Sequence, residues 1–478
     1  MSFITKFKKM SPVVKATLIF GIASFATSGI NYITTPIFTR LLTTTEYGMI
    51  TIYNTWYSVL QVIISLTLIY PGVLNVGLYE HSDNRWKYLS GVLGIITVNT
   101  VLFFVILLLF HKSIIRLINL PLSLVVLMLL LAMLQPAITL WTQKQRYEYR
   151  YKLAFLVSVG GAILSQIVSL ICVSIYKNTG INLAVVRLWG SGIVTLSISL
   201  VLYFYLLRKG RNFYDISLWK ETLIVTVPLI PHYLSHVVLN GTDKIMIERM
   251  VGMDKAGIYG LAATLSTIGV LLWRALKISF SPFVNKKLGE RDFNAISRSV
   301  KVLWINSAAL CVIGALLGPE VINLLGTKEY LEAINIVPPI AFGVYLHMLY
   351  DSFSAVSFFH KKSSMIMFAS ITAAISNVVL NYFFVKNFGY IAAAYTTMIS
   401  NIILVLMHYW IVKRIEKENV YNIKETILIS IITFFCCMTC LYLYMVPSFI
   451  RYIIAAIICA ILFSKKYVLY RTIATMKV

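Results

Sequence analysis

Five ionisable side chains of this sequence lie well inside long apolar segments, where a charge is costly. Two are acidic, Asp243 and Asp351. Three are basic, Arg187, Arg274 and Lys277. An ionised side chain at the centre of a bilayer costs about 3 kcal/mol or more, so such residues normally face protein or a water-filled cavity. A cavity lined by them is more cationic than anionic, which suits an anionic ligand.

The three basic residues can bind an anionic head group only if they point inward. Arg187 lies about 10 Å into its apolar segment, at a helical rise of 1.5 Å per residue. Arg274 and Lys277 are three residues apart, so they share one helical face near the cytoplasmic end of their segment. Pointing inward, this pair forms a clamp at the inner mouth of a cavity. The alternative for all three is a side chain that extends along its own helix to the membrane interface.

His232 lies just behind Pro228 and Pro231, which weaken the helix expected there. An interrupted helix that water can reach is suited to a gate or a binding site. The alternative is a hydrogen-bonded packing residue. The matching segment of the first half offers polar side chains without an acid, and its Asn31 joins His232 as a candidate for substrate binding.

A further group of charged residues lies at the expected outer end of the same segment. Asp243, Lys244 and Arg249 can form an ion-pair network that closes an outer gate. Arg40 occupies the position in the first half that corresponds to Arg249. The alternative is a helix end that neutralises its own charges, and the sequence leaves both interpretations open.

Motifs of catalysis and cofactor binding are missing from the sequence. It has no Gly-rich phosphate loop, no paired metal-ligand spacing and no Gly-Xaa-Ser-Xaa-Gly motif. Cys436, Cys437 and Cys440 share one apolar segment, but no His or carboxylate accompanies them, so we interpret them as small apolar residues. The connections between the apolar segments are short and leave no room for a soluble catalytic domain. We expect neither an enzyme nor a bound cofactor or metal.

The elements that must position these residues are membrane helices. The chain is 59% hydrophobic and only 13% charged, with a mean hydropathy of +0.82. A spanning helix needs about 20 apolar residues. Continuous apolar runs of this kind predict helices near residues 14–37, 49–70, 88–110, 120–141, 153–176, 181–207, 222–248, 256–282, 299–319, 334–358, 364–385, 388–412, 425–445 and 449–464. We therefore predict an all-α, polytopic membrane protein with about 14 transmembrane helices.

An internal duplication organises these helices. Residues 31–180 echo residues 240–389 at a fixed offset of 209, with Asn31 matching Asn240 and Gly48 matching Gly257. Two equivalent membrane halves are typical of alternating-access transporters, whose substrate site lies between the halves. We predict two pseudo-symmetric six-helix bundles, residues 1–210 and 211–415, followed by two additional helices and a tail, residues 416–478.

The distribution of Lys and Arg predicts the orientation in the membrane. Most of these 42 residues fall in the two termini and in the connections that we expect on the same side of the membrane as the termini. Because cytoplasmic connections are enriched in Lys and Arg, we expect both termini in the cytoplasm. The net charge of +24 is then explained by topology and by contact with anionic membrane lipid, and it does not indicate nucleic-acid binding.

Two segments in equivalent positions resemble a known family. TPIFTRLLTTTEYG leads from the first expected helix into the second, and NGTDKIMIERMVGMDKAGIYG leads from the seventh into the eighth. Both are similar to paired segments of bacterial polysaccharide flippases, which belong to the multidrug, oligosaccharidyl-lipid and polysaccharide exporter superfamily. Helix count, repeat arrangement and loop placement extend the similarity over essentially the whole chain.

The resemblance implies a flippase of the bacterial cytoplasmic membrane. Its expected substrate is a polyprenyl-diphosphate-linked oligosaccharide repeat unit, moved by alternating access for surface polysaccharide biosynthesis. Its expected partners are membrane lipid, a polysaccharide polymerase and glycosyltransferases. Two alternatives from the same superfamily stay open, a flippase of lipid II-type peptidoglycan precursors and a cation-coupled multidrug exporter. The scarcity of acidic residues in the membrane disfavours the exporter, since recognition of organic cations favours carboxylates.

Overall fold

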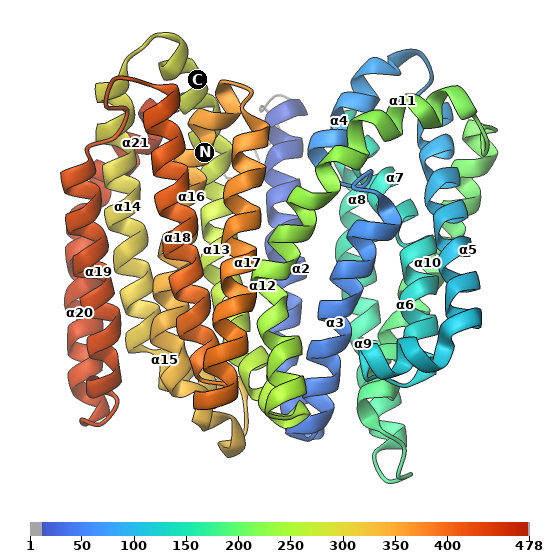
Figure 1. The fold of residues 1–478 in the computed structure, drawn as a ribbon, viewed down its shortest axis with the longest axis horizontal. Helices are drawn as coiled ribbons and strands as arrows, with labels where there is room; N and C mark the ends of the chain where they lie inside the picture. The colour runs from blue at the N-terminus through green and yellow to red at the C-terminus, as the bar shows by residue number, and fades with distance from the viewer. Residues whose placement is uncertain (1–11, 477–478) are drawn as a thin grey trace, which may run out of the picture. The chain divides into compact units, whose positions relative to one another are not determined.

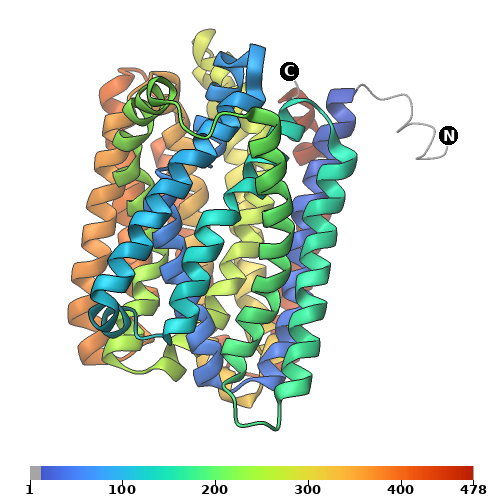
Figure 2. The same cartoon turned by 90° about the vertical axis from the view of Figure 1, so that its right-hand side faces the viewer.

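The computed structural model describes residues 12–476, and within that range it contains helices and no strand (Figure 1). The chain divides into two compact units, Met1–Val237 and Val238–Val478, with the boundary inside one helix. Within each unit the long helices run side by side and the connections gather at the two ends (Figures 1 and 2). The all-α polytopic fold expected from the sequence is confirmed.

The first unit is built from helices of very different length. Their bounds are α2 (Pro12–Leu41), α3 (Thr44–Ser65), α4 (Pro71–Glu80), α5 (Arg85–Ile118), α6 (Leu122–Leu134), α7 (Pro136–Tyr147), α8 (Tyr151–Phe155), α9 (Gly161–Tyr176), α10 (Leu183–Gly210) and α11 (Ile216–Thr226). Three single turns join them, η1 (Ser82–Asn84), η2 (Leu156–Gly160) and η3 (Val227–Leu229). The next helix, α12 (Ile230–Met250), contains the unit boundary.

The second unit continues with longer helices. Their bounds are α13 (Met253–Gly289), α14 (Phe293–Leu316), α15 (Gly318–Leu325), η4 (Lys328–Ile336), α16 (Val337–Phe359), α17 (Ser363–Phe388), α18 (Ala392–Ile415), α19 (Ile423–Leu443), α20 (Ser448–Ser464) and α21 (Lys466–Thr475). Its core includes Trp304 of α14, Phe353 of α16 and Tyr421, which precedes α19. Because Tyr421 also donates a 2.7 Å hydrogen bond to the carbonyl of Ser352, the connection into α19 is part of this core.

The count of membrane-spanning helices is slightly lower than expected from the sequence. Each of the 14 predicted segments contains a helix, but only 12 spans of the described chain are long and apolar enough to cross a membrane. Helices α20 and α21, bent by 48°, raise the number to 13 when taken as one span. Helix α3 is not among them, because its 22 residues include several Thr, Tyr, Asn and Gln side chains.

The helix near His232 is interrupted at the place where the sequence predicts that prolines weaken it. The predicted segment 222–248 is divided into α11 and α12 by the 3-10 turn Val227–Leu229, which contains Pro228. Proline lacks a backbone N–H and clashes with the preceding turn, so the regular α-helix ends there. Helix α11 lies at the same end of the first unit as α4 (Figure 1).

Candidate functional site

Arg187 lies near the start of α10 and contacts aromatic rings from two other helices. Its guanidinium carbon is 4.0 Å from the ring centroid of Phe38 on α2 and 5.9 Å from that of Tyr47 on α3. The electron-rich face of an aromatic ring attracts a cation, most strongly away from water. The guanidinium therefore reaches across to α2 and α3 within the first unit.

Two other candidates of the first unit lie on α2. Asn31 is exposed, and its Oδ1 accepts a 3.1 Å hydrogen bond from Nε2 of Gln166 on α9. Arg40 is also exposed, and its Nη1 donates to the carbonyl of Pro36 at 2.7 Å. Asn31 therefore joins two helices, while Arg40 binds the last turn of its own helix.

His232 lies in a group of aromatic rings at the start of α12. Its ring centroid is 5.3 Å from that of Tyr233 and 5.0 Å from that of His236, both in edge-to-face arrangements. Tyr233 in turn stacks on Tyr70 at 4.0 Å. His232 is half-buried. This arrangement can contact a sugar ring by stacking and a polar group through an imidazole nitrogen.

In the second unit, Lys277 forms an ion pair with Asp351. Its ammonium nitrogen is 2.7 Å from Asp351 Oδ1, and Nε1 of Trp273 donates to Asp351 Oδ2 at the same distance. Both carboxylate oxygens are thereby engaged, and the carboxyl is held between α13 and α16. The Lys277 side chain is 40% exposed and that of Asp351 only 11%. An ammonium has three donors, so Lys277 can bind an anion while it stays paired.

Rings on α16 and α18 continue this polar region. His347 lies one helical turn before Asp351, and its ring is 4.8 Å from that of Tyr350. Tyr350 in turn lies 5.4 Å from the ring of His408, which is fully buried. Arg274, the expected second half of the clamp, belongs to α13, but its side chain lies outside the described part of the structure.

Asp243 and Lys244, two of the residues expected to form an outer gate, share a hydrogen bond: the backbone N–H of Lys244 donates to Oδ1 of Asp243 at 2.8 Å. Asp243 is buried, and one of its oxygens accepts a 2.6 Å hydrogen bond from the hydroxyl of Tyr259 on α13. Lys244 donates from its ammonium to the carbonyl of Asn240 at 3.3 Å. Arg249 forms an ion pair with Glu248 at 3.2 Å. The hydrogen bond from Tyr259 attaches Asp243 to α13.

A chain of buried polar side chains on α17 and α18 is absent from the sequence-based candidates. Nδ2 of Asn381 donates to Oδ1 of Asn377 at 3.1 Å, and Nδ2 of Asn377 donates to Oγ1 of Thr397 at 3.0 Å. Thr396 donates to Asn381, which joins α17 to α18. Both asparagines are fully buried. Their spacing of four residues within an apolar segment was the signal that could have identified them.

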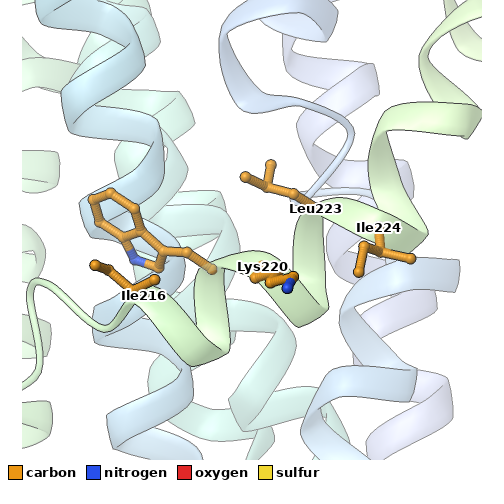
Figure 3. A pocket seen from close by; sticks show the side chains of 5 residues that line it. Ile216, Lys220, Leu223 and Ile224 are labelled. Carbon is orange, nitrogen blue, oxygen red and sulfur yellow. The ribbon is translucent and has the colours of Figure 1, made fainter.

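The described residues contain no group of three or more His, Cys, Asp or Glu side chains that could hold a metal ion. They do contain an open, apolar hollow of about 550 Å³ on α11, lined by Ile216, Trp219, Lys220, Leu223 and Ile224 (Figure 3). Trp219 is fixed there by a 3.0 Å hydrogen bond from its Nε1 to the carbonyl of Gly91 on α5. Lys220 is the single charged residue of this lining.

Comparison with known families identifies the family of this chain. Residues 13–274, more than half of the chain, match the family described as polysaccharide biosynthesis protein. The chain belongs to this family. Residues 228–383 also match the MatE family. The matches place the chain in the multidrug, oligosaccharidyl-lipid and polysaccharide exporter superfamily and confirm the resemblance found in the sequence.

Two curated relatives align with part of the chain. One is the capsular polysaccharide biosynthesis protein CapF of Staphylococcus aureus, 25% identical over 212 residues, which are 42% of this chain and 52% of the relative. The other is an uncharacterised membrane protein of Methanocaldococcus jannaschii, 22% identical over 211 residues, which are 42% of this chain and 41% of the relative. The chain thus spans about half the length of the curated relatives it matches, or less.

Solved structures with the same fold cover nearly the whole chain. The lipid II flippase MurJ in an inward closed conformation is 17% identical, with a TM-score of 0.63 over 95% of this chain and 98% of its own. A multidrug resistance MATE family transporter in an inward-facing conformation is 13% identical, with a TM-score of 0.60 over 84% of this chain and 96% of its own. Family and fold are those of multi-pass membrane transporters.

Proposed function

We propose that this protein moves polyprenyl-diphosphate-linked oligosaccharide repeat units across the bacterial cytoplasmic membrane by alternating access, for surface polysaccharide biosynthesis. The observation that carries the proposal is the match of residues 13–274 to the polysaccharide biosynthesis family. The similarity to CapF, a capsular polysaccharide biosynthesis protein, supports it. In this proposal both termini are cytoplasmic, and a polymerase and glycosyltransferases act on the same repeat units.

The physical problem is the charged diphosphate. The idealised cost of moving even one small ion from water into an apolar medium is of order 20 kcal/mol. Cationic side chains in a hydrated cavity offset this cost, while the prenyl tail stays in lipid. In our proposal Arg187 and Lys277 contact the diphosphate together with Arg274, and Asn31 and His232 contact the saccharide.

The moving bodies in this proposal are the two halves expected from the duplication, residues 1–210 and 211–415. Residues 416–478 move with the second half, because α19 and α20 pack against α14 of the second unit. Arg40, Asp243, Lys244 and Arg249 act at the outer gate. The attachment of Asp243 to α13 through Tyr259 supports a role in holding α12 and α13 together at that end.

A deletion strain tests the proposed function. We expect lipid-linked repeat units to accumulate in the cytoplasmic leaflet and the surface polysaccharide to disappear, with both defects corrected by the wild-type gene. The proposal fails if the repeat units still reach the outer leaflet at the normal rate.

A second candidate is transport of a lipid II-type precursor, which the fold similarity to MurJ over 95% of this chain favours. Complementation separates the two candidates. If this protein restores growth to cells depleted of their lipid II flippase, peptidoglycan precursor is a substrate. The multidrug exporter is disfavoured because Asp351 is already paired with Lys277 and Asp243 accepts a hydrogen bond from Tyr259.

A further inference from the structure

At one end of the first unit, a single carboxylate is surrounded by three cations. Glu148 follows the last turn of α7, and its Oε1 lies 2.5 Å from Nζ of Lys144 and 3.5 Å from Nη1 of Arg85. Its Oε2 lies 3.5 Å from Nε of Arg150. The group therefore carries an excess of two positive charges within ion-pair distance of one carboxylate.

Two of these cations are fixed in place by packing. The Lys144 side chain is only 4% exposed, and its ammonium lies 3.9 Å from the centroid of the Trp86 ring. Arg85 donates from Nε to the carbonyl of Leu78 at 3.0 Å, and its guanidinium lies 4.8 Å from the centroid of the Tyr147 ring. Arg150 is 70% exposed and lies on the solvent side of the group. The group is thus a built site with one open side.

The charge balance is unfavourable without a further anion. Arg85 and Arg150 each lie 3.5 Å from an oxygen of the same carboxylate, and two like charges gathered at one carboxylate repel each other. Arg85 is also the first residue of α5, where the partial positive charge of the helix N-terminus adds to the potential. At 3.5 Å neither arginine makes the short, bidentate contact that a guanidinium forms with a carboxylate or phosphate.

We propose that Arg85, Lys144 and Arg150 form a binding site for a phosphate ester at the membrane surface, with Glu148 as the group that the phosphate competes against. The orientation of this end toward the cytoplasm, and hence the identity of the ligand, rests on the proposed function. In that frame the site receives the diphosphate of the lipid-linked repeat unit before it enters the transport path. The phosphate of an ordinary anionic phospholipid offers the same chemistry.

Membrane topology accounts for basic residues at this end, but not for the convergence of three of them on one carboxylate. Neutralising Glu148 requires one cation, and the buried Lys144 already supplies it at 2.5 Å. At the fixed offset of 209, Lys144 and Glu148 correspond to Phe353 and Ser357, so the equivalent positions of the second half carry no charge. The two halves share their scaffold, whereas this group of charges belongs to the first half.

The experiment measures pyrophosphate binding to the purified full-length protein in phosphatidylcholine nanodiscs. We expect wild type to bind, Arg85→Gln and Arg150→Gln each to weaken the affinity by about tenfold, and Glu148→Gln to strengthen it by about tenfold because the competing carboxylate is removed. Arg208→Gln is the matched control, since Arg208 is an exposed basic residue in the last turn of α10. It should leave the affinity unchanged.

Arg150 is the decisive position, because its exposed side chain can be replaced without disturbing the fold. Unchanged pyrophosphate affinity in Arg150→Gln, with an unchanged melting temperature, overturns the proposal. Weaker binding by Glu148→Gln overturns it as well, since Glu148 would then support the ligand. Binding lost equally in Arg208→Gln shows a general charge effect and also overturns it.

Nanodiscs that contain phosphatidylglycerol identify the source of the phosphate. If phospholipid head groups take the site, they raise the apparent Kd for pyrophosphate in wild type and in Arg208→Gln alike. If the site is selective for a diphosphate, the Kd does not change. This measurement is independent of transport. If the protein binds pyrophosphate at this site but export proceeds without the protein, the binding site stands and the proposed function fails.

Discussion

At the scale of single residues, those ionisable side chains within the membrane that the structure describes are compensated by specific neighbours. Lys277 pairs with Asp351, Asp243 accepts a hydrogen bond from Tyr259, and the Arg187 guanidinium lies over Phe38. An unpaired charge in an apolar environment is expensive, so each partner reduces the cost of keeping a charge available for a ligand. These compensations make the effects of single substitutions predictable.

The Lys277–Asp351 pair should behave as a coupled unit in stability measurements. Asp351→Ala leaves a cation without its partner, and we expect a loss of about 1–3 kcal/mol, less than for a fully buried pair because Lys277 is partly exposed. Lys277→Met alone should also destabilise, since it leaves the Asp351 carboxylate without its cation. The double variant should recover part of the loss. Thermal unfolding of wild type, the two single variants and the double variant in detergent gives the coupling free energy between Lys277 and Asp351. Strictly additive losses of stability would contradict the pairing.

Arg187 should be essential for export through its charge. Arg187→Glu places a negative charge over Phe38 and should reduce export of repeat units at least tenfold, since an anion would repel the diphosphate. Arg187→Lys keeps the charge and should retain a substantial part of the activity. The measurement is surface polysaccharide per cell at matched protein levels. Undiminished export by Arg187→Glu would show that Arg187 only packs against α2.

At the scale of elements, polar contacts at helix ends fix how the shorter elements are attached. Asp215 precedes α11 and accepts hydrogen bonds from Ser217 at 2.6 Å, from the backbone N–H of Leu218 at 3.2 Å and from Asn212 at 3.1 Å. Lys87 at the start of α5 lies 3.6 Å away. Helix α11 is thereby capped and tied to α5.

These contacts should make the cap of α11 sensitive to acid. The hydrogen bonds from Ser217, Leu218 and Asn212, together with Lys87, hold the pKa of Asp215 well below its ordinary value. A carboxyl whose pKa is depressed by folding stabilises the protein above its unfolded pKa of about 4, and this contribution is lost as the pH falls through the folded value. We therefore expect Asp215→Asn to lower the melting temperature at pH 7 and to have a progressively smaller effect below about pH 4. An effect that does not depend on pH would contradict this account.

The last two long helices are held to the second unit by a buried arginine. Arg451 of α20 lies 2.8 Å from Oε1 of Glu320 on α15 and donates to the carbonyl of Leu316 at 3.1 Å. Tyr444 donates to the carbonyl of Ala315 at 2.5 Å. The additional helices are therefore anchored by specific polar contacts as well as by apolar packing.

Removing this anchor should loosen the C-terminal helices. Arg451→Met leaves Glu320 without its cation, and loss of one partner of a buried pair costs about 3–5 kcal/mol. We expect a clear fall in the melting temperature and faster hydrogen exchange in α20, while Arg451→Lys should be intermediate because it lacks the planar fork of donors. Exchange in α20 that matches wild type would show that apolar packing alone holds the helix.

At the scale of the whole molecule, the sequence predicts the helices well and their partners poorly. Each predicted apolar segment contains a helix, because length and hydropathy decide whether a segment can span a bilayer. The pairing of Lys277 with Asp351 joins residues 74 positions apart, which local patterns cannot reveal. One argument could still have predicted this pairing, because oppositely charged residues within the membrane are expected to form ion pairs.

Proline chemistry and tertiary packing account for two further features. The sequence predicts a helix weakened at Pro228 and Pro231, and a turn that contains Pro228 separates α11 from α12. The three cations around Glu148 look in the sequence like ordinary basic connections, because only folding brings α5 and α7 together at that end. Hydropathy describes how each helix meets the membrane, while the contacts between helices depend on tertiary packing.

The most direct test of the central claim is a flipping assay with the purified protein in liposomes. A polyprenyl-diphosphate-linked oligosaccharide, present in both leaflets, is exposed to an impermeant enzyme that acts only on the outer leaflet. Our account predicts that wild-type protein makes nearly all of the lipid accessible, whereas liposomes without protein and liposomes with Arg187→Glu retain an inaccessible half. If the wild-type protein leaves the same inaccessible half as protein-free liposomes, the account is contradicted.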